Sequence, residues 1–319
     1  MCYSAQIEAE YKKYVRVYGA RIDMATYAEL FWGRLESDRI KIPKAVEQGF
    51  AVPQNDQERN IQEAIDRFKL QQASQLEQEL FKQRKRLADA QRSLLAKPTK
   101  AATEAQRIST NKIGWVMSKL ADLRRTELAG QDSRIYPGYY APVIVFENGE
   151  RVVKPMRYQC RPAGKPVAYD NKYPGTYNAR RDNLEGFWKG QFGYTHGVMV
   201  VNAFYEHVSR PVANAGLAGA SEPTENVILE FRPRPEQSML VACLWSHWKG
   251  QGEPDLYSFA AITDEPPSEI AAAGHDRCVI PLKPESLDGW LRPDPKNLAA
   301  LYAILDDRER PYYEHRLAA

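Results

Sequence analysis

Apolar residues recur at every third or fourth position through much of the first 130 residues. From Asn55 to Leu128 this spacing gives one apolar helix face and one face of Gln, Glu, Lys and Arg, with the apolar positions at Ile61, Ile65, Phe68, Leu70, Leu76, Leu80 and Leu87. A proline cannot continue a helix, so we expect a break near Lys97 and Pro98. The pattern predicts a helical region over residues 7–131 that contains a helical hairpin or arm. Its mixed charges favour a solvated face packed on one side over a DNA-binding arm.

The pattern changes at Ser133 to short runs rich in β-branched and aromatic residues. Turn residues separate the runs YYAPVIVF, ERVVKPMRYQC, HGVMVVNAFYEHV, NVILEFRP, MLVACLWSHW and LYSFAAIT. Asn148 and Gly149 tolerate the positive φ of a tight turn, so a hairpin is expected between the first two runs. Strands at this spacing are typical of a β barrel or sandwich. The fold class expected is therefore α+β, mostly β in its second half.

The chain has 319 residues, of which 43% are hydrophobic and 27% charged. These fractions are typical of a folded protein. No apolar run approaches the length of a membrane span, and the first residues lack the order of a signal peptide, so we expect a cytoplasmic protein without membrane contact. Cys2, Cys160, Cys243 and Cys278 form no CxxC pair, which argues against a zinc site and a disulfide framework; no metal or cofactor is expected. The net charge of +3 permits a nucleic-acid partner without demanding one.

The N-terminal sequence MCYSAQ places a cysteine directly behind the initiator methionine. Methionine aminopeptidases remove Met1 before a small residue, which would leave Cys2 with a free α-amine and a thiol. The amine titrates near ~7.7 to 8.0 and the thiol near ~8.5, so each has a nucleophilic fraction at neutral pH. Taken alone, such a cysteine is more often an incidental thiol on a disordered terminus.

Three short stretches in the β-rich half carry residues that such a cysteine would need. TYNARRDN contains Asn178, Arg180 and Arg181, an amide and two cations suited to phosphate. NAFYEHV ends a predicted strand with Glu206, which could transfer protons if burial raises its pKa. AAAGHDRCVIPL contains His275 ahead of an apolar run. Each stretch alone is more often a polar loop, a surface carboxylate or a structural histidine, so only the combination is informative.

The combination resembles the SOS response-associated peptidase (SRAP) family. Its members begin Met-Cys and carry, in order, Asn-Ala-Arg, Phe-Tyr-Glu at a strand end and His-Asp-Arg before a short apolar run. This chain has Met1-Cys2, Asn178-Ala179-Arg180, Phe204-Tyr205-Glu206 and His275-Asp276-Arg277. The resemblance covers about residues 133–291 and the first few residues. It implies a catalytic N-terminal strand at residues 1–6, a helical insertion at 7–131 and a barrel-like or sandwich-like SRAP core at 132–319.

The resemblance implies that the chain senses abasic sites in single-stranded DNA during the SOS response to DNA damage. The amine of Cys2 would form a Schiff base with the ring-opened sugar aldehyde, and its thiol would close a thiazolidine, giving a covalent DNA-protein crosslink. The family is also described as an autoprocessing peptidase, because Met1 must be removed, and a lyase-like side activity is possible through the Schiff base. The localisation implied is the cytoplasm of a bacterium or phage host, at the nucleoid during repair.

Residue roles follow from the same resemblance. Cys2, Asn178, Glu206 and His275 would be catalytic: Asn178 holds the opened sugar or the amine, Glu206 transfers protons at the amine, and His275 acts on the sugar O4′. A second group would contact DNA: Arg180, Arg277, Tyr158, Thr263 and Arg181. No metal ligand is implied.

Several positions depart from the family pattern. Members usually continue Met-Cys-Gly-Arg, whereas this chain has Tyr3 and Ser4 and so lacks an arginine that grips phosphate. Tyr158 stands where a tryptophan would stack on a base, and His207 replaces the tryptophan after Phe-Tyr-Glu. A tyrosine face still offers stacking within the range of about 1–3 kcal/mol per base.

Two alternative functions remain open at this point. One is a thiol-dependent peptidase acting in trans, in which Cys2 and His275 form a nucleophile-base pair and Asn178 stabilises an oxyanion. The other is an interaction protein whose helical arm binds a protein partner or a second copy, with the β-rich half inactive.

Overall fold

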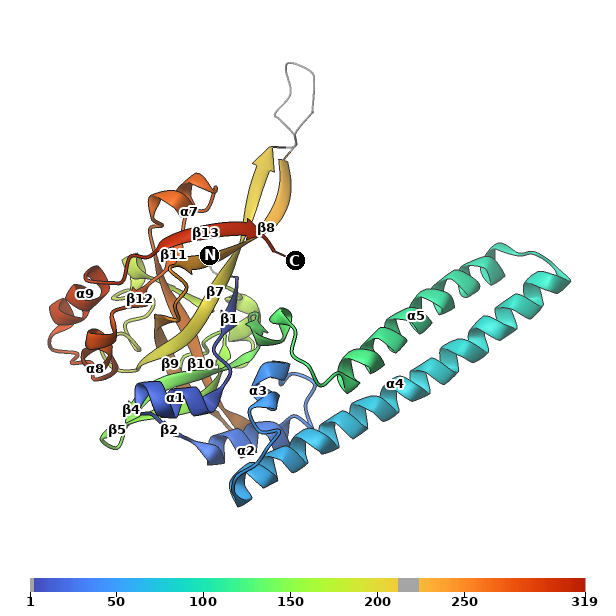
Figure 1. Ribbon diagram of the computed structural model, residues 1–319, viewed down its shortest axis with the longest axis horizontal. Coiled ribbons are helices and arrows are strands. Elements are labelled where there is room, and N and C mark those ends of the chain that lie inside the picture. Colours follow the sequence, from blue (N-terminus) through green and yellow to red (C-terminus); the bar gives the residue numbers. More distant parts are fainter. Residues whose placement is uncertain (1–2, 212–223, 319) are drawn as a thin grey trace, which may run out of the picture.

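The computed structural model describes residues 3–211 and 224–318, which form a β-rich body and a long helical arm (Figure 1). The elements of the first half are β1 (Ser4–Ile7), α1 (Tyr11–Tyr18), β2 (Arg21–Ile22), α2 (Met24–Gly33), α3 (Lys44–Gln48), α4 (Asp56–Ala96), α5 (Lys100–Arg124), η1 (Gly130–Ser133), β3 (Arg134–Ile135), β4 (Tyr140–Glu147) and β5 (Glu150–Tyr158). Those of the second half are α6 (Tyr169–Lys172), β6 (Asn178–Arg180), η2 (Arg181–Asn183), β7 (His196–Pro211), β8 (Thr224–Arg234), β9 (Met239–Gly250), β10 (Glu253–Asp264), α7 (Ser268–Ala272), β11 (Cys278–Val279), β12 (Pro281–Leu282), η3 (Pro284–Ser286), α8 (Leu287–Leu291), α9 (Leu298–Asp306) and β13 (Tyr312–Leu317).

Five strands form a closed ring, which we call the barrel: β4, β5, β10, β9 and β7. Their pairings are antiparallel except for β5 with β10, and the ring closes where the first part of β7 pairs with β9. Closure buries the inner face of every strand, and helices and loops cover much of the outside. The strands therefore read as nearly continuous apolar runs, such as MLVACLW in β9, rather than as an alternating pattern. The helices α8 and α9 lie on the side of the body away from the arm (Figure 1).

The strand β7 continues beyond the ring and pairs with β1, the first strand of the described chain. Its second half pairs with β8, which pairs in turn with β13. On its other edge β7 pairs with β1, and Ser4 lies opposite Tyr205. This register brings the start of the described chain beside Glu206, the next residue of β7.

The predicted hairpin between β4 and β5 is confirmed. Asn148 has φ of 52° and Gly149 has φ of 87°, the left-handed conformations that a tight turn of this kind requires. The two strands pair in register from Tyr140 opposite Arg157 to Glu147 opposite Glu150.

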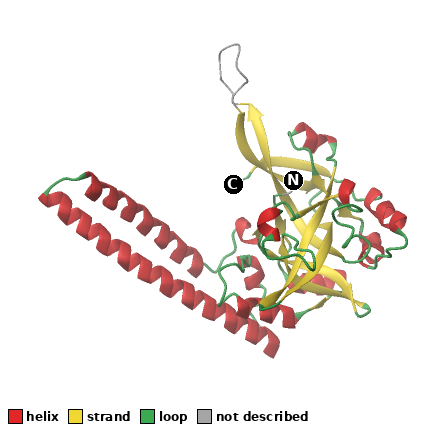
Figure 2. Cartoon of the chain, turned by 180° about the vertical axis from the view of Figure 1, so that it is seen from behind, coloured by secondary structure: helices red, strands yellow, loops and turns green. Residues whose placement is uncertain are grey.

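The predicted helical hairpin is also confirmed, with α4 ending at Ala96 and α5 beginning at Lys100. Asn55 caps α4 by accepting a hydrogen bond from the Glu58 amide, and Thr99 caps α5 by accepting one from the Ala102 amide. The inner end of α4 packs against α2 and buries Ile61, Ala64 and Ile65. The rest of the pair projects from the body, as both views show (Figures 1 and 2).

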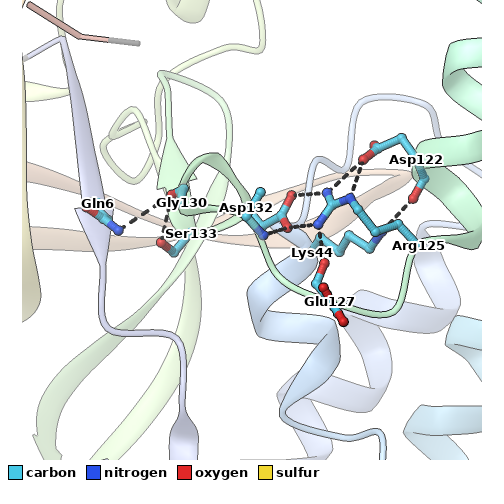
Figure 3. Close-up of polar contacts among 9 residues, drawn as sticks. Gln6, Lys44, Asp122, Arg125, Glu127, Gly130, Asp132 and Ser133 are labelled. Atoms are coloured by element: carbon cyan, nitrogen blue, oxygen red, sulfur yellow. Dashed lines mark hydrogen bonds and ion pairs between the residues drawn. The ribbon is translucent and has the colours of Figure 1, made fainter.

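A polar cluster joins the end of α5 to the body (Figure 3). The Arg125 guanidinium donates to both Asp132 carboxylate oxygens, at 2.7 and 2.8 Å, and to Asp122 at 2.7 Å. Lys44 of α3 donates to the Asp122 carbonyl, and Gln6 of β1 donates to the Gly130 carbonyl at 3.5 Å. The segment that follows α5, from Arg125 to Ser133, therefore connects the arm to β1. We call this segment the base of the arm.

The expected mixture of helix and sheet is confirmed, including the large sheet and the long helices near the N-terminus. Within residues 7–131, however, the structure also contains β2, and buried residues of α1, α2 and α3 belong to the same hydrophobic core as the barrel. The sequence pattern did not indicate α8, α9 or β13. Among the described residues, no helix combines the length and apolar composition needed to cross a membrane.

Candidate functional site

Glu206 lies on β7 with its side chain fully buried. Burial raises the pKa of this carboxyl, because the charged form loses hydration. Hydrogen bonds from His275 and from the Tyr3 backbone amide act in the opposite direction without cancelling the rise. A carboxyl whose pKa is raised by burial beside the N-terminal strand holds a proton more readily than an exposed carboxyl does.

His275 follows α7 and faces Glu206, with its Nε2 3.1 Å from Oε2 of the carboxylate. The turn before it needs a glycine: Gly274 has φ of 95°, and a Cβ there would lie 2.8 Å from a Val208 methyl. On the other side of the ring, Nδ1 lies 2.9 Å from the Arg277 carbonyl oxygen and 3.3 Å from the Arg277 amide. These contacts of Nδ1 decide which ring nitrogen of His275 is protonated. In either tautomer, the short distance between Nε2 and Oε2 requires a proton on one of the two atoms. Glu206 and His275 therefore form a buried proton-sharing pair.

Asn178 begins β6, which pairs in parallel with β10 so that Asn178 lies opposite Ala261. Its side chain is 6% exposed, and Oδ1 accepts a hydrogen bond from the Tyr158 hydroxyl at 3.4 Å. Tyr158 is itself fully buried, stacked on Phe259 at 5.2 Å and edge-on to Tyr177. The ring expected to stack on a base is therefore covered by protein here, and its contact orients Asn178.

Arg180 and Arg277 meet at one carboxylate, that of Asp182. Arg180 Nη2 lies 2.6 Å from Asp182 Oδ2, and Arg277 Nη2 lies 4.0 Å from the same oxygen. The sequence places the two arginines 97 positions apart, and the pairing of β6, β10 and β11 brings them together. Half of the Arg180 side chain is exposed, and Asp276 lies 4.0 Å from Arg277 Nε, so two carboxylates balance the two guanidinium groups at this surface.

Thr263 lies on β10, opposite Arg180 of β6 on one side and Val279 of β11 on the other. It is fully buried, and its hydroxyl finds no hydrogen-bond partner within the described chain. Buried hydroxyl groups normally have a hydrogen-bond partner, so Thr263 is an exception among the described residues.

Arg181 stands apart from the other expected DNA contacts. Its guanidinium donates to Asp306 of α9 at 2.5 Å and lies 3.8 Å from Asp264. It lines a cavity of about 730 Å³ together with Arg308 and Tyr313. The structure thus does not bring Arg181 to the same carboxylate as Arg180.

Cys2 lies outside the described residues. The described chain begins with Tyr3, whose amide donates to Glu206. The other cysteines are buried, and burial raises the pKa of each thiol, for Cys160 to about 12. Those three thiols are therefore protonated at neutral pH.

Sequence reasoning missed two features around Tyr3 and Ser4. The Tyr3 ring contacts Tyr136, Tyr177 and His207, and the dense aromatic stretch IYPGYY at 135–140 was the available signal. Arg134 of β3 donates to the Ser4 hydroxyl at 2.9 and 3.0 Å and lies 3.6 Å above the Tyr205 ring. A guanidinium thus lies beside residue 4, where the family pattern expects an arginine in the chain itself.

No group of three or more His, Cys, Asp or Glu side chains converges on a point that could hold a metal ion, within the part of the chain that the structure describes. The groups available for chemistry are an acid-base pair, an amide and paired guanidinium groups.

The family described as SOS response associated peptidase (SRAP) matches residues 67–316. A crystal structure of a Bordetella bronchiseptica protein is 17% identical, with a TM-score of 0.45 over 61% of this chain and 90% of that one. One from Bacteroides thetaiotaomicron is 14% identical, with a TM-score of 0.45 over 58% and 77%. A phage-related protein from B. bronchiseptica is 16% identical, with a TM-score of 0.43 over 61% and 85%. No curated protein matches the chain.

Proposed function

The chain belongs to the SOS response associated peptidase family, and from that premise we propose that its Cys2, freed of Met1, captures abasic sites in single-stranded DNA as a covalent thiazolidine. One observation carries the proposal. The amide of Tyr3, the residue bonded to Cys2, donates to a buried carboxylate that shares a proton with His275. An acid-base pair is thus available next to the N-terminal residue.

The chemistry balances with loss of one water. The α-amine of Cys2 adds to the aldehyde carbon of the ring-opened sugar, and the carbinolamine hydroxyl leaves as water to give a Schiff base. The thiol sulfur then bonds to the same carbon, and its proton passes to the nitrogen, which closes a five-membered ring. Only an N-terminal cysteine holds both groups in the required relation.

Glu206 and His275 would move the protons of these steps. Glu206 accepts a proton as the amine attacks and returns one to the departing hydroxyl. As the sugar ring opens, the C1′ hydroxyl gives its proton to Glu206 while His275 donates a proton to O4′. The proton on Glu206 then passes to His275 across the Nε2–Oε2 contact, which returns both side chains to their starting states. The raised pKa of the Glu206 carboxyl suits this exchange because burial makes the carboxylate a stronger base than an exposed one.

The DNA backbone would bind the paired guanidinium groups of Arg180 and Arg277. Phosphate contacts fix the position of the strand without reading its sequence, and charge-assisted bonds from guanidinium are among the strongest available. Asp182 holds both side chains at one place until a phosphate displaces it. Asn178, oriented by Tyr158, would hydrogen-bond the opened sugar.

The remaining cysteines support the assignment to Cys2. Each of the other three is buried with a raised thiol pKa and has no adjacent free amine, so none can form a thiazolidine.

Intact mass spectrometry tests the proposal directly. The purified protein is measured before and after incubation with a single-stranded oligonucleotide that carries one abasic site. We expect loss of Met1 and then a mass increase equal to the oligonucleotide minus one water, stable to denaturation. A mature chain that begins at Cys2 but forms no adduct would refute the proposal.

Three variants sharpen this experiment. Cys2→Ala should form no stable adduct. Cys2→Ser keeps the amine, so it should give a product only when borohydride reduces the Schiff base. Cys243→Ala is the matched control, a buried cysteine on β9 that should crosslink like the wild type.

A further inference from the structure

Tyr3 is held in one orientation by aromatic side chains from three different segments. Its ring meets His207 at 5.0 Å, Tyr136 at 5.9 Å and Tyr177 at 6.4 Å between centroids, each edge to face. These are favourable geometries for aromatic pairs. Tyr3 as a whole remains 38% exposed. Tyr3 therefore presents a fixed aromatic surface to solvent rather than a loose terminal side chain.

The same residue connects the two parts of the candidate site. Its backbone amide donates to Glu206, which pairs with His275. Its ring contacts Tyr177, the neighbour of Asn178. Tyr3 therefore contacts Glu206 through its backbone and the residue before Asn178 through its ring.

Two of the other tyrosines nearby are much less available than Tyr3. Tyr158 is fully buried and Tyr177 is 9% exposed, so neither offers an open face. His207 is exposed and Tyr136 is half-buried, and both support the Tyr3 ring. The open aromatic surface beside the pair is thus built around Tyr3.

We propose that Tyr3 determines which flanking sequence the protein prefers, because its ring stacks on the base next to the abasic site. The inference rests on the proposed function and adds a specificity to it. An abasic site leaves a gap in the row of stacked bases, and an aromatic ring beside the reacting aldehyde can cover the exposed face of a neighbour. A purine offers more stacking area than a pyrimidine, so purine-flanked sites should react faster at limiting DNA.

The experiment compares crosslinking rates of full-length variants on single-stranded oligonucleotides whose abasic site is flanked by adenine or by thymine. The wild type should favour adenine. Tyr3→Ala should raise the half-saturating DNA concentration by about fivefold or more, the factor that corresponds to about 1 kcal/mol of lost stacking. It should also lose the preference, while the rate at saturating DNA stays within about twofold because Glu206 and His275 remain.

Further variants separate stacking from a structural role. Tyr3→Phe keeps the ring and should behave as the wild type. Tyr3→Leu keeps apolar volume without an aromatic face and should behave as Tyr3→Ala. Tyr194→Ala, which removes another exposed tyrosine ring at a cavity lined by Pro295 and Leu298, should leave the preference unchanged. Intact mass spectrometry confirms Met1 removal in each protein.

The outcomes separate this inference from the function beneath it. If the wild type crosslinks and both Tyr3→Ala and Tyr3→Leu keep its half-saturation and its flank preference, the stacking role is refuted and the function stands. If Tyr3→Leu keeps the half-saturation and the flank preference that Tyr3→Ala loses, the apolar volume of the side chain rather than stacking is responsible. That result also refutes the stacking role. If the wild type forms no adduct with either oligonucleotide, both proposals fail.

Discussion

The arm and the barrel differ in where their charged and large apolar side chains lie. Along α4 and α5 the charges pair at the surface with residues three or four positions away, as in Arg107 with Glu104 and Arg67 with Glu63. Large apolar side chains such as Phe81 and Leu95 point into solvent. In the barrel, apolar side chains are enclosed, and the carboxylate of Glu206 is buried with them.

This difference shows where each region obtains its stability. The arm depends on helix propensity and end caps, which are local in sequence, and on contacts between its own two helices, such as Arg124 with Glu77. The barrel depends on strands that meet across long sequence separations and on closure of the ring. The same chemical substitution should therefore have different consequences in the two regions.

The largest expected contrast comes from removing one phenylalanine ring in each region. Phe259→Ala would leave a cavity in the barrel and destabilise the protein by about 3–5 kcal/mol, whereas Phe81→Ala removes a ring that is 74% exposed and should change stability by less than about 0.5 kcal/mol. Urea denaturation followed by circular dichroism measures both. Similar losses for the two variants would mean that the outer arm is packed against something in solution.

The junction between the regions should give an intermediate effect. The hydrogen bond from Arg125 lowers the pKa of the Asp132 carboxyl. Burial opposes this less strongly, and the Ala129 amide lowers the pKa further. The ion pair therefore stabilises the fold above the unfolded pKa near ~3.9, and this contribution is lost as the pH falls through the lowered pKa. We expect Asp132→Asn to lower Tm by about 3 °C at neutral pH.

Thermal unfolding at several pH values checks this second prediction. The gap between wild type and Asp132→Asn should narrow as the pH falls toward ~4 and below. A gap that stays constant with pH would show that packing around Asp132, rather than its charge, holds the base of the arm.

The smallest effect concerns one carboxylate in each region, changed to an amide. The pKa of Glu206 is raised by burial, so its ionised form destabilises the fold as the pH rises from the unfolded value near ~4.3 through the folded pKa. Glu206→Gln should therefore raise Tm by about 2 °C at neutral pH while reducing crosslinking, and this advantage should shrink as the pH falls. Glu104→Gln, in an exposed pair, should not shift Tm measurably. A fall in Tm for Glu206→Gln would mean that its hydrogen bonds to His275 and Tyr3 outweigh the burial of charge.

The helical hairpin, the Asn148–Gly149 turn and most strands could be predicted from sequence because the signals are local. Spacing of three and four residues, a proline between helices and turn residues between apolar runs each act over fewer than about ten positions. The short elements α8, α9 and β13 could not, because their positions depend on the surface against which they pack. The strand pattern predicted a barrel or a sandwich but could not decide between them, since nothing in β7 alone specifies that it pairs with both β4 and β9.

For the candidate site, the sequence by itself determined the list of residues and little of their arrangement. Asn178, Glu206 and His275 were recognisable as types in order along the chain. Only the tertiary structure decided that Glu206 and His275 share a proton, that Asp182 joins Arg180 to Arg277, and that Tyr158 is covered while Tyr3 is open. The physical reason is that burial and charge pairing depend on strand register and ring closure, which join residues far apart in the sequence.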